Sequence, residues 1–536
     1  MIVLKSIARM TDTASPAIRK PLAAVVGQGL WDLLVVGGGA TGLGVALEAQ
    51  LRGLRVLLVE ARDFASGTSS RSTKLLHGGV RYLAQGHWGL VREALRERAT
   101  LMDLAPHLAQ PLPFFVPLQG RWSFLRMAIG LGIYQRMAGA RSLGPLVRHS
   151  RHDLQAQWPA GVPANYGAFE YWDGQFEDAR LALALARTAQ EQGACVRNYT
   201  RLVDLQDIAG RWQARLEDAL TGETVELEVP CVVQATGVWA DELRRIYPRL
   251  GQGQAAKGPW VKVSQGVHLV IPQARFAIQQ AVLVPRTQDG RVLFALPWLG
   301  SVVLGTTDTP RSDAPVEPRA FAHEVNFIVG QARRMLGLDL RRDDIRSIWV
   351  GLRPLVQDQT ESQVTATMGR EHRVWRHAPG LYAVSGGKWT TYRQIGQDVV
   401  DQLCDFGDAR AGASVSCRHR LFGAPSAGTA AVSLMQAPGI HLWGSQAEVI
   451  ESLPGHGRPL GMGLTEAMVR YSARHEWALT TEDMLARRWR SLFLDARAAR
   501  TMAPAVAAIL QEETGRDPQL ADFLALCDHY ADPPGL

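Results

Sequence analysis

Residues 32–42 read Asp-Leu-Leu-Val-Val-Gly-Gly-Gly-Ala-Thr-Gly, and this stretch decides the fold. After Asp32, residues 33–36 form an apolar run that is typical of a strand buried on both faces of a parallel sheet. The apolar spacing of residues 43–52 predicts a helix, and a second apolar run, 55–59, predicts the next strand. A strand, a glycine-rich turn, a helix and a second strand in this order indicate a dinucleotide-binding βαβ unit.

Each part of this unit has an expected role. We expect Gly37 to permit the tight turn, Gly39 to let backbone N–H groups approach a pyrophosphate, and Gly42 to let the helix pack close to the strand. Thr41 belongs to the same set, at a helix N-terminus that attracts phosphate charge. Glu60 ends the second strand, where a carboxylate can accept hydrogen bonds from ribose hydroxyls, so a 2′-phosphate is disfavoured.

The next segment favours a flavin over a nicotinamide. Residues 66–82 are rich in hydroxyls and glycines, which suits close contact with more phosphate and with a flavin. The apolar run 231–234 then meets Ala-Thr-Gly, and a strand ending in this way is typical of two-lobed flavoproteins. We therefore expect FAD. The expected contacts from these two segments are Thr68, Ser69, Ser70, Lys74, Leu75, His77, Gly78, Ala235 and Gly237.

Composition narrows the class of protein. The 536 residues include 58 Lys and Arg against 51 Asp and Glu, a net charge of +7, and five Cys without a C-x-x-C pair. Such cysteines argue against a disulfide framework and a Cys-based metal centre, and they favour a reducing compartment. We expect no metal. No zinc-finger or RNA-binding signature accompanies the basic charge, so we expect no nucleic acid. No apolar run predicts a membrane-spanning helix.

A basic, aromatic stretch predicts contact with a membrane surface. Residues 104–152 contain six Arg and no Asp or Glu, and residues 121–137 place three of these Arg among aromatic and aliphatic side chains. A basic amphipathic surface of this kind suits the interface of an anionic bilayer, with the protein peripheral rather than spanning. The alternative is a basic face packed against other domains.

The expected fold is α/β. We expect a Rossmann-like two-dinucleotide-binding flavoprotein domain, a β-rich substrate domain and a C-terminal helical domain. The expected boundaries are a disordered extension at 1–30, a discontinuous FAD domain at 31–108, 170–262 and 345–405, a substrate domain at 109–169 and 263–344, a linker at 418–435 and helices at 436–536.

From about residue 31 to beyond 500, the chain resembles the FAD-dependent (aerobic, membrane-associated) glycerol-3-phosphate dehydrogenase family. Six blocks in the family's order carry the resemblance, at 68–83, 169–180, 305–308, 351–355, 386–393 and 475–488. The resemblance implies oxidation of sn-glycerol 3-phosphate to dihydroxyacetone phosphate, with electrons passed from FAD to membrane quinone. It also implies a peripheral position on the cytoplasmic face of the inner membrane. The C-terminal helices are candidates for contact in a homodimer.

The substrate that the resemblance implies is a small dianion with a secondary alcohol. Arg353 and Arg81 are candidate phosphate clamps, because a guanidinium binds phosphate with two parallel hydrogen bonds. Tyr82 is a candidate hydrogen-bond donor to substrate.

Lys388 is one of only six Lys in the chain. We expect Gly387, Lys388 and Thr390 to contact the cofactor, and Lys388 is also a candidate for contact with substrate or reduced flavin. The base that takes the hydroxyl proton is left open between His77, His268 and Lys388.

One departure from the family pattern concerns residues 265–268. Gln265 and Val267 replace the Lys and Ser of the family's Lys-Gly-Ser-His, so we expect a charge near the site to be missing. Three alternatives stay open: an oxidase that uses O₂, an enzyme acting on another small 2-hydroxy or 2-amino acid, and a non-catalytic FAD-binding protein at the membrane.

Overall fold

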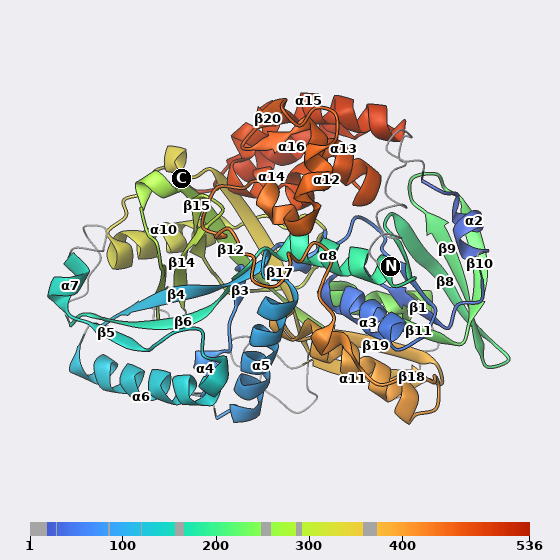
Figure 1. Ribbon diagram of the computed structural model, residues 1–536, viewed down its shortest axis with the longest axis horizontal. Helices are drawn as coiled ribbons and strands as arrows, with labels where there is room; N and C mark the ends of the chain where they lie inside the picture. Colours follow the sequence, from blue (N-terminus) through green and yellow to red (C-terminus); the bar gives the residue numbers. More distant parts are fainter. Residues whose placement is uncertain are drawn as a thin grey trace.

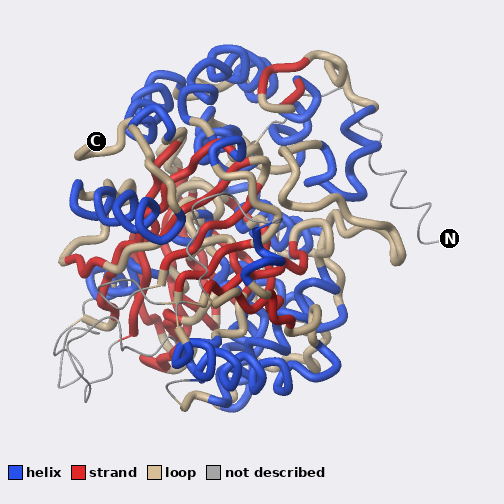
Figure 2. The backbone as a smooth tube through the Cα atoms, turned by 90° about the vertical axis from the view of Figure 1, so that its left-hand side faces the viewer, coloured by secondary structure: helices blue, strands red, loops and turns tan. Residues whose placement is uncertain are grey.

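Two large sheets lie side by side beneath a layer of C-terminal helices (Figure 1). The structure, a computed structural model, describes residues 19–27, 29–83, 86–118, 120–155, 166–247, 259–285, 292–356 and 372–536. Turned by 90°, the molecule shows strands at its centre and helices above and below them (Figure 2).

The first large sheet has six strands, of which all but the antiparallel edge strand β18 run parallel. In spatial order they are β18 (His372–Ala378), β19 (Leu381–Gly386), β11 (Cys231–Gln234), β1 (Leu33–Val36), β2 (Val56–Val59) and β7 (Cys195–Arg197).

Both faces of this sheet are covered, as the apolar run at 33–36 predicts. Leu33 and Val35 pack against one layer of helices, formed by α3 (Ala40–Leu51), α8 (Asp178–Glu191) and α11 (Tyr392–Asp405). Leu34 and Val36 face a three-stranded antiparallel sheet on the opposite side. Its strands are β10 (Thr224–Val229), β9 (Arg211–Asp218) and β8 (Thr200–Ile208).

The second large sheet has ten strands and is mostly antiparallel. Its main path is β16 (Thr309–Arg311), β12 (Val261–Pro272), β15 (Ser301–Gly305), β14 (Leu293–Trp298), β13 (Ala281–Val284), β4 (Ala109–Pro117), β6 (Ala168–Phe176) and β3 (Leu75–Leu76). Two more strands join it, β17 (Ser347–Val356) beside β12 and β5 (Val147–His149) beside β6.

The composition of this sheet differs from the expected division of the chain. Strands β3, β6 and β17 fall mainly in segments assigned by sequence to the FAD domain, yet they pair with strands of the substrate side. Pairing between β12 and β17 runs from Val261 opposite Val356 to Val270 opposite Ser347. Residues 170 and 345 therefore do not separate the two sheets.

Helices cover both faces of the ten-stranded sheet. On one face lies α10 (Ala322–Leu336). Other helices outside the C-terminal domain are α4 (Val80–Leu83), α5 (Trp88–Leu104), α6 (Arg121–Ala138), α7 (Arg151–Gln155) and α9 (Leu243–Ile246). Among the residues described, the structure contains no helix with both the length and the apolar character needed to cross a bilayer.

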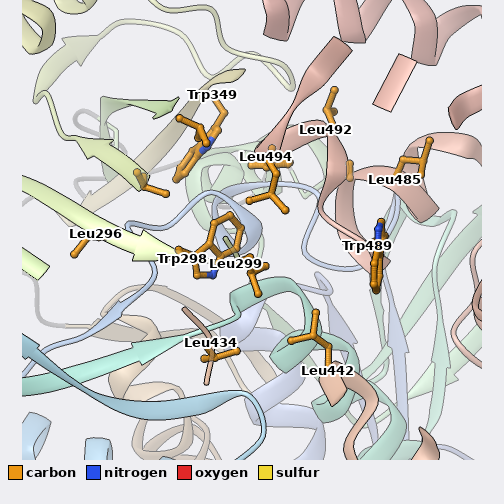
Figure 3. Packing of buried hydrophobic residues seen from close by; sticks show 14 of the residues in the cluster. Leu296, Trp298, Leu299, Trp349, Leu434, Leu442, Leu485, Trp489, Leu492 and Leu494 are labelled. Carbon is orange, nitrogen blue, oxygen red and sulfur yellow. The ribbon is translucent and has the colours of Figure 1, made fainter. Parts of the chain in front are cut away.

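The C-terminal helices share one apolar core with this sheet. They are α12 (Ala447–Glu451), α13 (Glu466–His475), α14 (Ser491–Leu494), α15 (Ala496–Thr514) and α16 (Leu520–Ala531), with a short hairpin of β20 (Pro459–Gly461) and β21 (Leu464–Thr465). In Figure 3, Trp298 and Trp349 from the sheet meet Leu492 and Leu494 from the helical layer. The helical domain therefore rests directly on the sheet.

Two segments expected to be loose are held in place. In the expected linker 418–435, Leu434 is buried and its carbonyl accepts a hydrogen bond from Leu299 N at 2.8 Å. At the N-terminus, residues 1–18 lie outside the described residues. From residue 19 on, however, the chain packs on the three-stranded sheet: α2 (Leu22–Val26) begins where Leu22 N donates to Glu223 at 2.7 Å.

Candidate functional site

A cavity of about 800 Å³ opens at the carboxyl ends of β1, β2, β11 and β19. In open parallel sheets this edge is the usual place for a bound ligand. The far wall comes from β12 and β17 of the second sheet, so the cavity lies between the two sheets. Fifteen expected site residues line it: Gly37, Gly39, Thr41, Glu60, Thr68, Ser69, Leu75, His77, Ala235, Gly237, His268, Arg353, Gly387, Lys388 and Thr390.

The glycine turn has the geometry that its spacing predicts. Gly37 has φ +116°, and a Cβ there would lie 2.5 Å from the carbonyl oxygen of Ala235. A Cβ on Gly42 would overlap the carbonyl oxygen of Gly37, because α3 starts directly against the turn. The backbone thus forms an open cradle at a helix N-terminus, where N–H groups and the helix dipole favour phosphate.

Glu60 and Ser69 hold this cradle in shape. The Glu60 carboxylate accepts hydrogen bonds from Gly38 N at 2.7 Å and from Arg62 N at 2.9 Å. Burial raises the pKa of Glu60, while these two N–H groups act in the opposite direction. Ser69 Oγ accepts from Ala40 N at 2.9 Å. The cradle, the acidic group at the end of β2 and the cavity of about 800 Å³ together fit FAD.

His268 reaches the cavity from β12 and is almost fully buried. Its Nε2 lies 3.0 Å from Thr73 Oγ1, and its ring stacks on Trp349 with 3.9 Å between centroids. Burial lowers the pKa of His268 well below its usual value, and the positive charges of Arg353 and Lys74 lower it further. The imidazole is therefore neutral at physiological pH.

Arg353 enters the cavity across a gap left by a glycine. Its guanidinium donates to Thr306 Oγ1 and to the carbonyl oxygen of Thr307, both at 3.1 Å, and pairs with Asp308 at 3.3 Å. A Cβ on Gly266 would lie 2.2 Å from a guanidinium nitrogen of Arg353, so a larger residue there would make the Arg353 side chain shift. These contacts fix the direction of a cation with several N–H donors.

The departures at 265 and 267 do not remove a charge from the cavity, which corrects the expectation drawn from the family pattern. Along β12, Gly266 and His268 face the cavity, whereas Gln265 and Val267 point to the other side, as alternation requires. Gln265 is fully buried there and donates to Glu324 at 2.5 Å.

Lys388 and His77 complete the polar lining. Gly386 and Gly387 both have positive φ, +84° and +78°, and this turn carries Lys388 to the cavity wall. Tyr134 holds the loop after His77 in place: Gly78 N donates to Tyr134 Oη at 3.0 Å, and Tyr134 Oη donates to Asp173 at 2.9 Å.

Four expected contacts do not line the cavity. Gly42, Ser70 and Gly78 lie behind it and shape its wall. Lys74 is fully buried, and its Nζ donates to Asp178 at 2.7 Å. Burial lowers the pKa of Lys74 to about 7, against the opposing effect of Asp178.

The side chains of Arg81 and Tyr82 on α4 lie outside the described part of the structure, so their roles stay predictions.

Sequence reasoning missed several residues of the site. Thr73 contacts His268, and Trp349 stacks beneath it. At the far end of the cavity, the Arg62 guanidinium lies 5.1 Å from the ring centroid of Trp239. The hydroxyl run at 66–73 was a signal for Thr73. Trp349 had no such signal, because only the pairing of the distant strands β12 and β17 brings it beside His268. Trp239 follows the Ala-Thr-Gly block at the end of β11 by two residues, so its place in the sequence was a signal.

Comparison with known proteins agrees with this architecture. Residues 32–402 match the family described as FAD dependent oxidoreductase, and residues 441–521 match the C-terminal domain of alpha-glycerophosphate oxidase. The mitochondrial glycerol-3-phosphate dehydrogenase of Mus musculus is 37% identical over 523 residues, covering 90% of this chain and 70% of that protein. The mitochondrial enzyme of Arabidopsis thaliana is 37% identical over 527 residues, covering 90% and 82%.

A solved structure covers nearly the whole chain. The glycerol-3-phosphate dehydrogenase from Bacillus halodurans, complexed with FAD, has a TM-score of 0.74 at 27% identity and covers 95% of this chain and 98% of its own. The expected α/β flavoprotein fold, the FAD cofactor and the family resemblance are all confirmed. By its matched domains and its relatives, the chain belongs to the FAD-dependent glycerol-3-phosphate dehydrogenase family.

Proposed function

We propose that the protein oxidises sn-glycerol 3-phosphate to dihydroxyacetone phosphate, with hydride passing from C2 to N5 of FAD and electrons passing on to membrane quinone. The observation that carries this proposal is the convergence of Arg353, His268, Lys388 and His77 on the cavity that holds the glycine turn. The printed names of the relatives support the same substrate.

Arg353 supplies charge and direction for the substrate phosphate. Its position is set by hydrogen bonds to Thr306 and Thr307 and by an ion pair with Asp308. A guanidinium has five N–H donors and matches phosphate oxygens in pairs. Arg81, from the neighbouring helix α4, is proposed as a second phosphate ligand, and Tyr82 as a donor to substrate.

His268 is proposed as the group that takes the proton of the C2 hydroxyl. Its low pKa keeps it neutral in the free protein. A bound phosphate dianion offsets the nearby positive charges and raises the pKa of the imidazole, so proton affinity increases when substrate arrives. FAD, when bound, supplies the two-electron acceptor. Lys388 stabilises negative charge at the same wall, and His77 lines it from the opposite segment.

Helix α6 is proposed as the membrane contact. Its outer face exposes Trp122, Leu125 and Ile129, at 78%, 48% and 56%, beside the exposed Arg121 and Arg126. An apolar stripe flanked by Arg suits the headgroup region of an anionic bilayer. Because quinone is dissolved in the membrane, a protein that reduces it has to bind there. We place the protein as a peripheral protein on the cytoplasmic face of the inner membrane.

Turnover with different acceptors tests this proposal. The FAD-loaded protein should reduce a short-chain quinone when given sn-glycerol 3-phosphate, and should form little peroxide in air. Rapid peroxide formation without quinone reduction would instead favour an oxidase, a function that the match at 441–521 keeps in view. No turnover with glycerol 3-phosphate, but turnover with a 2-hydroxy or 2-amino acid, would contradict the substrate assignment.

A further inference from the structure

A second cavity, of about 390 Å³, lies away from the flavin site at the edge strand β7. Four parts of the chain meet there: the segment before α2, the end of α8, strand β7 and the C-terminal domain around α13. The residues that line it are Arg19, Lys20, Val25, Trp31, Arg187, Gln190, Gly193, Ala194, Cys195, Val196, Arg197, Ala473, Arg474, His475, Trp477 and Leu479.

The lining is strongly basic. Among the described residues around this cavity, five are Lys or Arg and none is Asp or Glu. Arg19 and Arg197 share a single carboxylate, Asp218, at 3.1 and 2.6 Å. One negative charge therefore faces two guanidinium groups, and this pair keeps a net positive charge.

Two further cations, Arg187 and Lys20, form no ion pair with a carboxylate in the part of the chain that the structure describes, although Glu191 acts on Arg187 at longer range. Arg187 donates to the carbonyl oxygen of His475 at 2.5 Å and lies 4.5 Å from the ring centroid of Phe422. Its Nε is buried and has no hydrogen-bond partner among the described residues. Lys20 is exposed at the cavity's rim. Arg474 pairs with Glu513 at 2.6 Å, a carboxylate that it shares with Arg470.

Nearby titratable groups respond to this excess of positive charge. The pKa of Arg19 falls to about 10, through burial and then through Arg197. The pKa of His475 falls to about 4, through burial and then through Arg187. A bound anion would offset the contribution of Arg197 and Arg187 to these two shifts, since an opposite charge within a few ångströms stabilises a cation.

We propose that this cavity is a binding site for a small phosphate-bearing molecule, separate from the sites for FAD and for substrate. Several guanidinium groups around one hollow are the arrangement that recognises phosphate. Trp31 and Trp477 add two indole rings to the wall, which gives a flat organic group such as a nucleobase an apolar surface. The chemical group that this cavity recognises is a phosphate, which either a nucleotide or an inorganic phosphate can supply.

The location links this cavity to the cofactor site. Strand β7 pairs with β2, and the carbonyl oxygen of Arg197 accepts a hydrogen bond from Glu60 N at 2.9 Å. An occupant therefore ties together the N-terminal segment, the sheet edge and the C-terminal domain. We expect it to raise the melting temperature of the FAD-loaded protein, because a ligand that binds only the folded state stabilises that state.

The test is a thermal titration of the full-length, FAD-loaded protein with ADP and, separately, with inorganic pyrophosphate, at constant ionic strength. The melting temperature should rise saturably with at least one of the two probes. A stronger response to ADP indicates a nucleotide, and an equal response indicates that phosphate alone is recognised. No saturable rise with either probe overturns the proposal.

Variants locate the effect. Arg187→Gln and Lys20→Gln should each weaken the apparent affinity about tenfold, as expected for loss of a charged contact. Arg333→Gln is the matched control, since Arg333 is 75% exposed on α10 and lies outside the cavity lining. Unchanged affinity in both Arg187→Gln and Lys20→Gln overturns the assignment of this cavity. Turnover with glycerol 3-phosphate should be unchanged in them, so failure here is distinct from failure of the proposed function.

Discussion

Arg353 lines the cavity beside Gly266, where a Cβ would displace its guanidinium, and this position makes it the sharpest target for a single substitution. Arg353→Ala should leave FAD bound but lower kcat/KM for glycerol 3-phosphate about tenfold or more, through loss of a charged hydrogen bond. Arg353→Lys should recover only part of the loss, because an ammonium lacks the guanidinium fork. Steady-state kinetics and the flavin content per protein measure both effects.

A matched control for this prediction lies on the same sheet. Arg311 binds Asp313 and Gln265 and is absent from the cavity lining, so Arg311→Ala should retain normal kinetics. Normal kcat/KM in Arg353→Ala would remove Arg353 from the site.

The neutral state of His268 makes a prediction about pH. An ordinary histidine titrates at about 6.5. Burial, Arg353 and Lys74 lower the pKa of His268, so it remains an unprotonated base as the pH falls through that value. The plot of kcat/KM against pH, which reports the free protein, should therefore have no acid limb from His268 near neutrality.

The variant His268→Asn should lower kcat about 100-fold while FAD stays bound, as expected for loss of a general base. A limb centred at about 6.5 that disappears in His268→Asn would show an ordinary histidine and contradict this account.

Helix α6 has an inner face that packs against the protein and an outer face that is exposed. Its inner face carries Tyr134, which bonds to the loop that bears His77, and its outer face carries the exposed apolar stripe. Trp122→Glu combined with Ile129→Glu should weaken binding to vesicles that contain anionic lipid about tenfold or more, because both apolar contact and charge balance are lost. Vesicle sedimentation measures this, and added salt should weaken the wild-type binding.

The control for the membrane prediction is an exposed apolar residue elsewhere. Val316, 41% exposed, belongs to the segment before α10. Val316→Glu should bind vesicles normally. Equal binding by the α6 double variant and by wild type would remove α6 as the contact.

At the scale of the whole molecule, buried contacts join the C-terminal domain to the flavin side. Arg490 donates to the carbonyl oxygen of Ser70 at 2.6 Å, and Arg488 donates to Asp63 at 2.9 Å. His107 lies at a similar junction, beside Gly423 and Gly444. Burial lowers its pKa to about 3. The domains are therefore expected to lose stability together when buried groups are forced to ionise.

This junction predicts loss of stability in mild acid. Below pH of about 6.5, the unfolded chain protonates His107 while the folded chain does not, so stability falls by about 1.4 kcal/mol per pH unit from this group. His377 and His475, whose pKa values are lowered to about 4, act in the same direction. Melting temperatures between pH 7.5 and 5.5 measure the slope. The slope should be smaller in His107→Gln, and an equal slope would contradict the buried, neutral state of His107.

Local patterns predicted some parts of this molecule well. The run at 33–36 is buried on both faces, and Gly37 and Gly42 have the conformation and the packing that their spacing required. Pairing between distant strands was not visible in the sequence, because antiparallel register depends on the whole fold. For that reason the sequence pattern assigned most of β6 and β17 to the FAD domain, although both strands belong to the ten-stranded sheet, and it did not identify Trp349.

The positions of two single residues, Lys74 and Gln265, differ from those that the sequence predicts. The sequence predicts Lys74 at the cofactor, but its backbone has a φ of +65° and its side chain is buried in the interior. The neighbouring residue types do not predict this backbone conformation. Gln265 is different, because alternation along one strand already places it opposite His268. That signal was available in the sequence.

An anaerobic spectrum tests the central claim most directly. The FAD-loaded protein is mixed with sn-glycerol 3-phosphate without oxygen, and absorbance at about 450 nm, where oxidised flavin absorbs, is followed. We predict that the band bleaches, that a soluble quinone restores it, and that Arg353→Ala needs a higher substrate concentration. A flavin that dithionite bleaches but glycerol 3-phosphate does not would contradict the account.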